Sequence, residues 1–129
     1  MTTLRPSAGA GLALRAAILA LTLATGWIHL TLGGPLFTLN AAGYAVAAAA
    51  MVAPLALAAR FRWLVRLGLA GYAATAIVAW YMTGPRYEVA YLAKGIEIAL
   101  IALLLVEVRA YDGSLVARLR GTARPFPRA

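Results

Sequence analysis

The sequence predicts an all-α fold: an integral membrane four-helix bundle built from two transmembrane helical hairpins. Of its 129 residues, 64% are hydrophobic and only 12% are charged, whereas charged residues supply about a quarter of an ordinary soluble domain. The apolar residues form four stretches, each near the roughly 20 residues that a helix needs to cross the hydrocarbon core. Arginines gather in every second connection between these stretches. One compact bundle uses most of the chain, so no second domain is expected.

The first predicted hairpin consists of spans at about 14–32 and 36–59, joined by Gly33, Gly34 and Pro35. Glycine tolerates the backbone angles needed after a helix end, and proline is favoured in the first turn of the next helix. Pro54 falls inside the second span, where we expect it to bend the cytoplasmic end of the helix.

The second predicted hairpin also has glycine followed by proline in its loop. Its spans cover about 63–82 and 88–108, and residues 83–86 (TGPR) join them. Residues 1–13 and the basic segment 109–129 remain as an N-terminal and a C-terminal tail, both expected in the cytoplasm.

The arginines predict the direction of crossing. If the four spans cross the membrane in alternating directions, all of the 12 basic residues except Arg86 and Lys94 fall on the same side of the membrane. Loops rich in Lys and Arg stay cytoplasmic. The chain is therefore predicted to be a multi-pass protein of a bacterial cytoplasmic (inner) membrane with both termini in the cytoplasm. The predicted topology anchors are Arg15, Arg60, Arg62, Arg66 and Arg109. A cleaved N-terminal signal is the alternative, but the apolar run continues to Leu32 and favours a retained span.

Composition also bounds the partners. The net charge of +8 comes from arginines that flank apolar spans, a pattern that does not form the basic face of a nucleic-acid-binding domain. The chain has no cysteine, which excludes disulfides, thiolate metal sites and cysteine nucleophiles. The expected partners are the lipid bilayer and, through small residues on the helices, a second copy or a larger membrane complex.

Polar residues within the spans share one level in the outer half of the predicted bundle. Tyr91, Lys94 and Glu97 follow one another at a spacing of three and so lie on one helical face. We expect this face to turn inward, because charged groups in lipid are costly. The inner half, between the cytoplasmic arginines, is expected to be almost purely apolar. The candidate outer-half cluster comprises His29, Asn40, Tyr44, Tyr91, Lys94 and Glu97.

Two interpretations of this cluster stay open. In the functional one, a small polar cavity opens to the periplasm, and Glu97 exchanges protons or receives a cationic ligand. In the structural one, Lys94 and Glu97 form an ion pair while His29 and Asn40 hydrogen-bond neighbouring helices. No metal, cofactor or catalytic residue is predicted: a single histidine excludes bis-histidine haem, and zinc would need the loose set His29, Glu97 and Glu88. A quinone or lipid site near the aromatic residues is physically possible.

Three stretches carry a resemblance: residues 26–30 (GWIHL), 35–44 (PLFTLNAAGY) and 91–97 (YLAKGIE). They resemble small four-span inner-membrane proteins of bacteria for which we know of no established function, and the architecture is loosely similar to DoxX-type proteins. The resemblance implies a four-span membrane fold and no particular activity, because no diagnostic motif is present.

The expected function is therefore that of a small non-enzymatic membrane protein. It acts by helix association, with itself or with a larger complex, or by binding a small ligand in the outer-half cavity. One alternative is a small proton-coupled transporter or carrier that uses Glu97, Lys94 and His29. The other is a subunit of a membrane redox enzyme.

Overall fold

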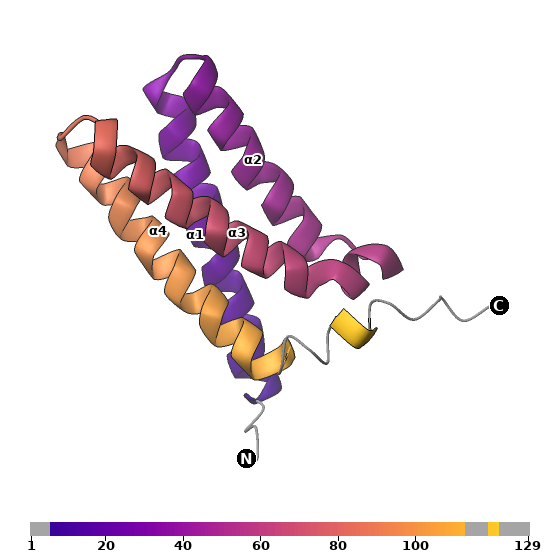
Figure 1. Cartoon of the computed structure of the whole chain (residues 1–129). Helices are drawn as coiled ribbons and strands as arrows, with labels where there is room; N and C mark the ends of the chain where they lie inside the picture. The colour runs from indigo at the N-terminus through magenta and orange to yellow at the C-terminus, as the bar shows by residue number, and fades with distance from the viewer. Residues whose placement is uncertain (1–5, 113–118, 122–129) are drawn as a thin grey trace.

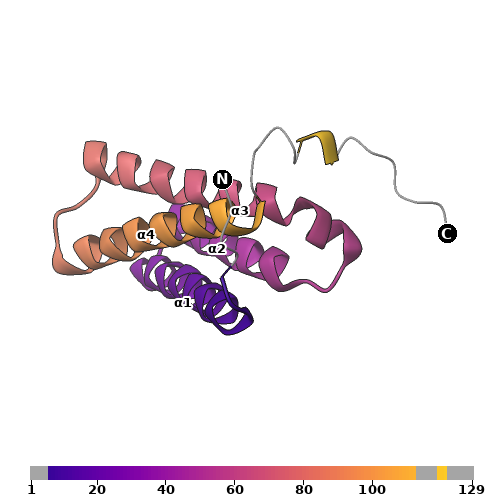
Figure 2. The same cartoon turned by 90° about the horizontal axis from the view of Figure 1, so that it is seen from below.

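The computed structural model describes residues 6–112 and 119–121, and within them the chain is helical with no strand. Four helices follow one another: α1 (Ala8–Leu32), α2 (Pro35–Val52), α3 (Ala56–Thr83) and α4 (Glu88–Glu107), which continues into the short π-helical turn η1 (Val108–Asp112). Each helix packs against the next, and α4 packs against α1, which closes the bundle (Figures 1 and 2). The predicted all-α four-helix bundle of two hairpins is confirmed.

Glycine makes the tighter of the two hairpin loops possible. Gly33 and Gly34 have φ angles of +73° and +88°, a region that side chains with a Cβ rarely occupy. Pro35 then opens α2 as its first residue. We call the end of the bundle that holds residues 33–34 and 84–87 the hairpin end. The opposite end, which holds the α2–α3 connection and the described parts of both termini, is called the terminal end (Figure 1).

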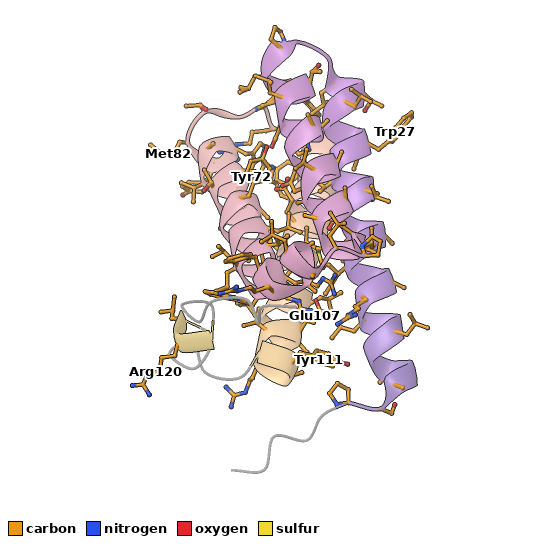
Figure 3. All side chains as sticks on the ribbon, turned by 90° about the vertical axis from the view of Figure 1, so that its right-hand side faces the viewer. Trp27, Tyr72, Met82, Glu107, Tyr111 and Arg120 are labelled. Atoms are coloured by element: carbon orange, nitrogen blue, oxygen red, sulfur yellow. The ribbon has the colours of Figure 1, made fainter. Side chains whose placement is uncertain are left out.

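All four helices are long and apolar enough to cross a membrane. Large apolar side chains cover the outside of the bundle: Trp27 is 67% exposed and Met82 75% exposed, and both point away from the helices (Figure 3). A surface of this kind is suited to lipid rather than water. The chain thus has the architecture of a multi-pass membrane protein.

Two helices begin earlier than the sequence predicts. The first starts at Ala8, six residues before the expected boundary, because the Ser7 hydroxyl caps it by accepting a hydrogen bond from the Ala10 amide at 3.2 Å. The third starts at Ala56, seven residues early. Residues 8–13, expected in the N-terminal tail, are therefore helical, while residues 1–5, 113–118 and 122–129 of the predicted tails lie outside the described residues.

The expectation for Pro54 is wrong. Instead of bending the second helix, this proline lies beyond its end, since α2 stops at Val52 and residues 53–55 connect it to α3. Ala53 has φ −55° and ψ 125°, the extended geometry that a following proline imposes. The second span consequently ends seven residues earlier than predicted.

The middle of the bundle is an apolar layer. Its buried members come from all four helices: Ile18, Met51, Leu69, Leu100 and Leu104. Ile18, Leu100 and Leu104 are completely inaccessible. This layer separates the buried polar groups near the hairpin end from those near the terminal end.

Candidate functional site

Helix α4 carries two fully buried carboxylates. Glu97 and Glu107 are both 0% exposed, and Leu100 and Leu104 between them are also 0% exposed. The spacing 97, 100, 104, 107 is that of one face of a helix, so both glutamates point into the bundle. A carboxylate in such surroundings is costly unless it is paired and hydrogen-bonded, and each of the two has its own set of partners.

Glu97 is held by three helices. Within α4, Lys94 Nζ lies 2.6 Å from Oε2. Oε1 accepts hydrogen bonds from the Tyr44 hydroxyl of α2 at 3.0 Å and from the Thr25 hydroxyl of α1 at 3.1 Å. His29 Nε2 of α1 lies 3.7 Å from the same oxygen. The carboxylate therefore fixes α1 and α2 against α4 near the hairpin end.

The orientation of His29 follows from its backbone contact. Its Nδ1 lies 2.7 Å from the carbonyl oxygen of Thr25, and because a carbonyl only accepts, Nδ1 must carry a hydrogen. Nε2 is thus the nitrogen directed toward Glu97. The imidazole ring also packs against Phe37 and Tyr44, at centroid distances of 6.1 and 5.6 Å.

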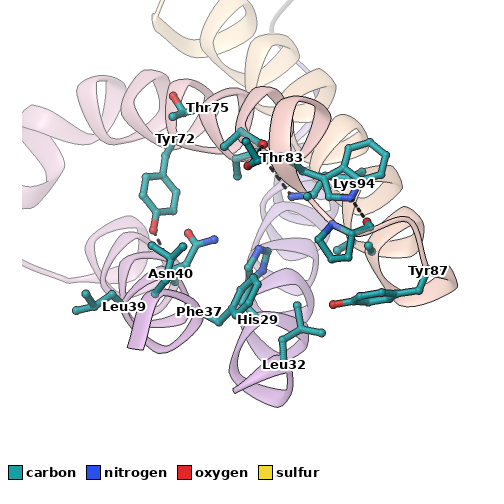
Figure 4. A pocket seen from close by; sticks show the side chains of 18 residues that line it. His29, Leu32, Phe37, Leu39, Asn40, Tyr72, Thr75, Thr83, Tyr87 and Lys94 are labelled. Atoms are coloured by element: carbon teal, nitrogen blue, oxygen red, sulfur yellow. Dashed lines mark hydrogen bonds between the residues drawn. The ribbon is translucent and has the colours of Figure 1, made fainter. Parts of the chain in front are cut away.

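A cavity of about 480 Å³ lies beside this cluster at the hairpin end (Figure 4). All four helices contribute to its wall, together with the α3–α4 loop. Most lining residues are aliphatic or aromatic, and three are polar groups from the predicted cluster: His29, Asn40 and Lys94. The volume lies within the range of about 300–1,000 Å³ that is typical of small-molecule sites.

Of the buried ion pair between Lys94 and Glu97, only the Lys94 ammonium side lines the cavity. Lys94 lines it, whereas Glu97 and Tyr44 are not among its lining residues. Glu97 instead accepts hydrogen bonds from Lys94, Tyr44 and Thr25. This placement opposes the expectation that Glu97 receives a cationic ligand, because a ligand in the cavity meets the ammonium first.

Three polar groups on the wall keep hydrogen-bonding capacity. Besides Glu97, Lys94 Nζ has only a long contact of 3.4 Å to the Ala76 carbonyl among the described residues. The Asn40 carboxamide has no hydrogen bond within that part of the chain, since Tyr72 donates to the Asn40 backbone carbonyl instead. His29 Nε2 has only its 3.7 Å approach to Glu97.

Three other polar side chains on the wall, those of Thr75, Trp80 and Thr83, donate to nearby backbone carbonyls. Thr75 and Thr83 donate to carbonyls one turn earlier, and Trp80 Nε1 donates to the Pro85 carbonyl at 2.7 Å. Besides the Tyr87 hydroxyl at the α3–α4 loop, the capacity to bind a polar head group lies at Lys94, His29 and Asn40.

Tyr91 does not join the cluster, which corrects the sequence-based expectation. It is 54% exposed, while Lys94 and Glu97 on the same helix are buried. Tyr91 lies at the edge of the arc of about 120° that these three positions subtend at 100° per residue. Its ring packs edge-on against Trp80 instead, at a centroid distance of 5.1 Å.

A second ionic cluster lies near the terminal end and was not predicted. Glu107 pairs with Arg66 of α3, whose Nε lies 2.9 Å from Oε2, and with Arg15 of α1, whose Nε lies 3.0 Å from Oε1. Arg66 is only 3% exposed, and Figure 3 shows Glu107 on α4 near the terminal end. The half of the bundle expected to be almost purely apolar thus contains a buried ion triad.

The remaining predicted anchors lie around this triad or beyond it. Arg62 donates to the Ala53 carbonyl at 3.1 Å, and Arg60 stacks over the Phe61 ring at 5.6 Å. Arg109 lies exposed in η1. Arg15 and Arg66, by contrast, use their charge to neutralise Glu107.

Three residues that contact members of the two polar clusters were not predicted from the sequence. Thr25 precedes His29 by four residues, a helical spacing that would have placed it beside the histidine. Glu107 shares its face with Glu97, which the spacing of the apolar residues between them indicates. Tyr72 had no such signal, because its contact with Asn40 depends on how α2 and α3 meet.

No three His, Asp or Glu side chains within residues 6–112 and 119–121 come together in a way that could hold a metal ion. Glu88, named above as a zinc ligand, lies at the start of α4 and away from Glu97 along the helix. Comparisons of this chain with family models, curated proteins and solved structures found no match.

The ion triad should be essential for stability. We predict that Glu107→Gln lowers the free energy of unfolding by about 3 kcal/mol, because it removes the carboxylate that pairs with the buried Arg66. The value is at the lower end for a buried pair, since the Arg15 side chain is 45% exposed. The measurement is reversible unfolding in mixed micelles.

Glu88→Gln is the matched control, because Glu88 is an exposed residue in the first turn of the same helix. Glu88→Gln should lower the free energy of unfolding by less than about 1 kcal/mol, the usual size of a helix-dipole contribution. Equal losses in the two variants would contradict a structural role for the triad.

Proposed function

We propose that this chain is a small non-enzymatic protein of a bacterial inner membrane that binds a small, largely apolar ligand in the cavity at its hairpin end. The observation that carries the proposal is the cavity itself: about 480 Å³, with mostly aliphatic and aromatic walls and three converging polar groups. Ligand sites typically combine an apolar lining with a few placed polar groups that orient the ligand.

We further propose that the terminal end faces the cytoplasm and the cavity faces the periplasm. Arg60, Arg62, Arg66 and Arg109 all belong to the terminal end, and an excess of basic residues marks the cytoplasmic side. Arg86 is the one arginine in the hairpin-end loops. The ligand would therefore be met in the outer leaflet or in the periplasm.

The arrangement of buried residues supports ligand binding more than it supports proton-coupled transport across the membrane. A proton-coupled carrier that used Glu97 would need a polar route onward to the terminal end. Between Glu97 and Glu107 lie the inaccessible side chains of Ile18, Leu100 and Leu104. Glu97 itself already holds Lys94, Tyr44 and Thr25. These observations support a site that opens on one side only.

Quenching of Trp80 fluorescence tests the binding site. Trp80 lines the cavity, and replacing Trp27 and Trp63 by phenylalanine leaves it the sole tryptophan of the three. In lipid nanodiscs, the neutral probe ω-bromoundecanol should quench Trp80 saturably, because bromine quenches only at close range. Excess undecanol should reverse the quenching.

A matched pair of alanine substitutions on α3 separates the cavity from the surrounding lipid. Ala76→Phe places a ring in the cavity wall and should remove the saturable component. Ala74→Phe makes the same change at an exposed position outside the cavity and should leave it intact. Purely linear quenching in the parent protein, unaffected by undecanol, would refute the binding site.

Cysteine labelling tests the orientation, helped by the absence of native cysteine. In intact cells with a permeabilised outer membrane, Thr83→Cys at the hairpin end should react with a membrane-impermeant maleimide. Leu57→Cys, an exposed position at the terminal end, should react only after the inner membrane is broken. The reverse labelling pattern would contradict the proposed orientation, with the hairpin end in the periplasm and the terminal end in the cytoplasm.

A further inference from the structure

The shape and charge of the cavity identify a class of ligand. We infer that it binds an amphiphile with a single anionic head, a fatty carboxylate in its simplest form. The ligand enters from the outer leaflet between α2 and α3 and places its head against Lys94, His29 and Asn40. This inference rests on the proposed ligand-binding function and adds the charge of the ligand and its route.

The route is indicated by where α2 and α3 meet and where they part. The Tyr72 hydroxyl donates to the Asn40 carbonyl at 3.2 Å and bridges the two helices at one edge of the cavity (Figure 4). Toward the hairpin end the two helices diverge (Figure 1). The α2 side of this gap is formed by Leu36 and Leu39, which line the cavity and are 75% and 70% exposed on the bundle surface. An apolar mouth on a lipid-facing surface admits a molecule that already resides in the membrane.

The depth of the polar groups suits a head group. His29 lies three residues from the end of α1, Asn40 five residues from the start of α2, and Lys94 six residues from the start of α4. At a rise of 1.5 Å per residue, these positions are about 5–9 Å inside the hairpin end. The interfacial layer of a bilayer is roughly 5–8 Å thick on each side. An amphiphile with its head at this level keeps its chain in the hydrocarbon.

The sign of the charge follows from which partner of the ion pair faces the ligand. Lys94 lines the cavity and Glu97 does not, so an anion approaches the ammonium and stays farther from the carboxylate. Lys94 has three N–H donors, of which Glu97 takes one at 2.6 Å and the Ala76 carbonyl only a long contact. The Asn40 amide and, when protonated, His29 Nε2 supply further donors.

A single negative charge matches what the wall can compensate. Lys94 is already balanced by Glu97, and of the other lining residues only His29 can gain a positive charge. Its Nδ1 hydrogen is held by the Thr25 carbonyl, so the second proton would sit on Nε2, toward Glu97 and the ligand. A doubly charged head would leave one charge uncompensated in a low-dielectric site.

The test compares three probes that differ only in their heads: ω-bromoundecanoate, ω-bromoundecanol and ω-bromoundecylamine. Saturable quenching of Trp80, with the Ala76→Phe variant as the lipid background, gives the affinity of each. The carboxylate should bind roughly tenfold tighter than the alcohol, as expected for a charge-assisted hydrogen bond. The amine should bind no better than the alcohol.

Two variants locate the selectivity. Lys94→Met combined with Glu97→Gln removes both charges without stranding either and should abolish the preference for the carboxylate over the alcohol. Asn40→Leu strands no partner, because the Asn40 amide has none among the described residues, and should reduce the preference by a few fold. Size-exclusion profiles check that both variants remain folded. If the double variant does not fold, Asn40→Leu alone decides.

The outcomes separate this inference from the function on which it rests. Equal affinity for carboxylate and alcohol, or a preference for the amine, would overturn the anionic ligand. A carboxylate preference that survives in both variants would overturn the placement of the head against Lys94 and Asn40. In each case the cavity remains a binding site. If none of the three probes quenches saturably, the binding function fails as well.

Discussion

The two buried glutamates of α4 impose the strongest physical constraint on this bundle. A carboxylate inside a low-dielectric bundle is strongly unfavourable unless opposite charge and hydrogen bonds surround it. Glu97 obtains these from α1, α2 and its own helix, and Glu107 obtains them from α1 and α3. Because lipid gives no hydrophobic drive for helix association, these contacts set how the four helices meet at both ends.

The same constraint gives the cavity its chemical character. Glu97 turns inward to its donors, and this leaves the outer side of Lys94 facing the empty space between the hairpins. The buried Glu97 thereby holds the Lys94 ammonium at the wall of the cavity. The inaccessible side chains of Ile18, Leu100 and Leu104 lie between the two ionic clusters. One cluster therefore lies beside the cavity, and the other joins α1, α3 and α4 near the terminal end.

The sequence predicted correctly those features that depend on residues close together in the chain. Hydropathy and the glycine–proline loops predicted the number of helices and their pairing, and helical spacing predicted that Lys94 and Glu97 share a buried face. The sequence-based predictions were wrong for residues whose contacts lie far away in the chain. Arg15 and Arg66 read as flanking anchors because nothing near them in the chain reveals Glu107, 92 and 41 residues away. Tyr91 and Tyr72 depend likewise on how α3 meets α4 and α2, which no periodicity contains.

The charge state of Glu97 tests the account most directly. A carboxylate that holds Lys94 as an ion pair must be ionised, whereas a proton carrier must spend part of its time protonated. Infrared difference spectra between the wild-type protein and Glu97→Gln, recorded in lipid at neutral pH, report which form is present. We predict that carboxylate bands are lost, that the amide bands of the new glutamine appear, and that no protonated carboxyl band changes. A protonated carboxyl band that disappears with the substitution would contradict the account and favour proton exchange at Glu97.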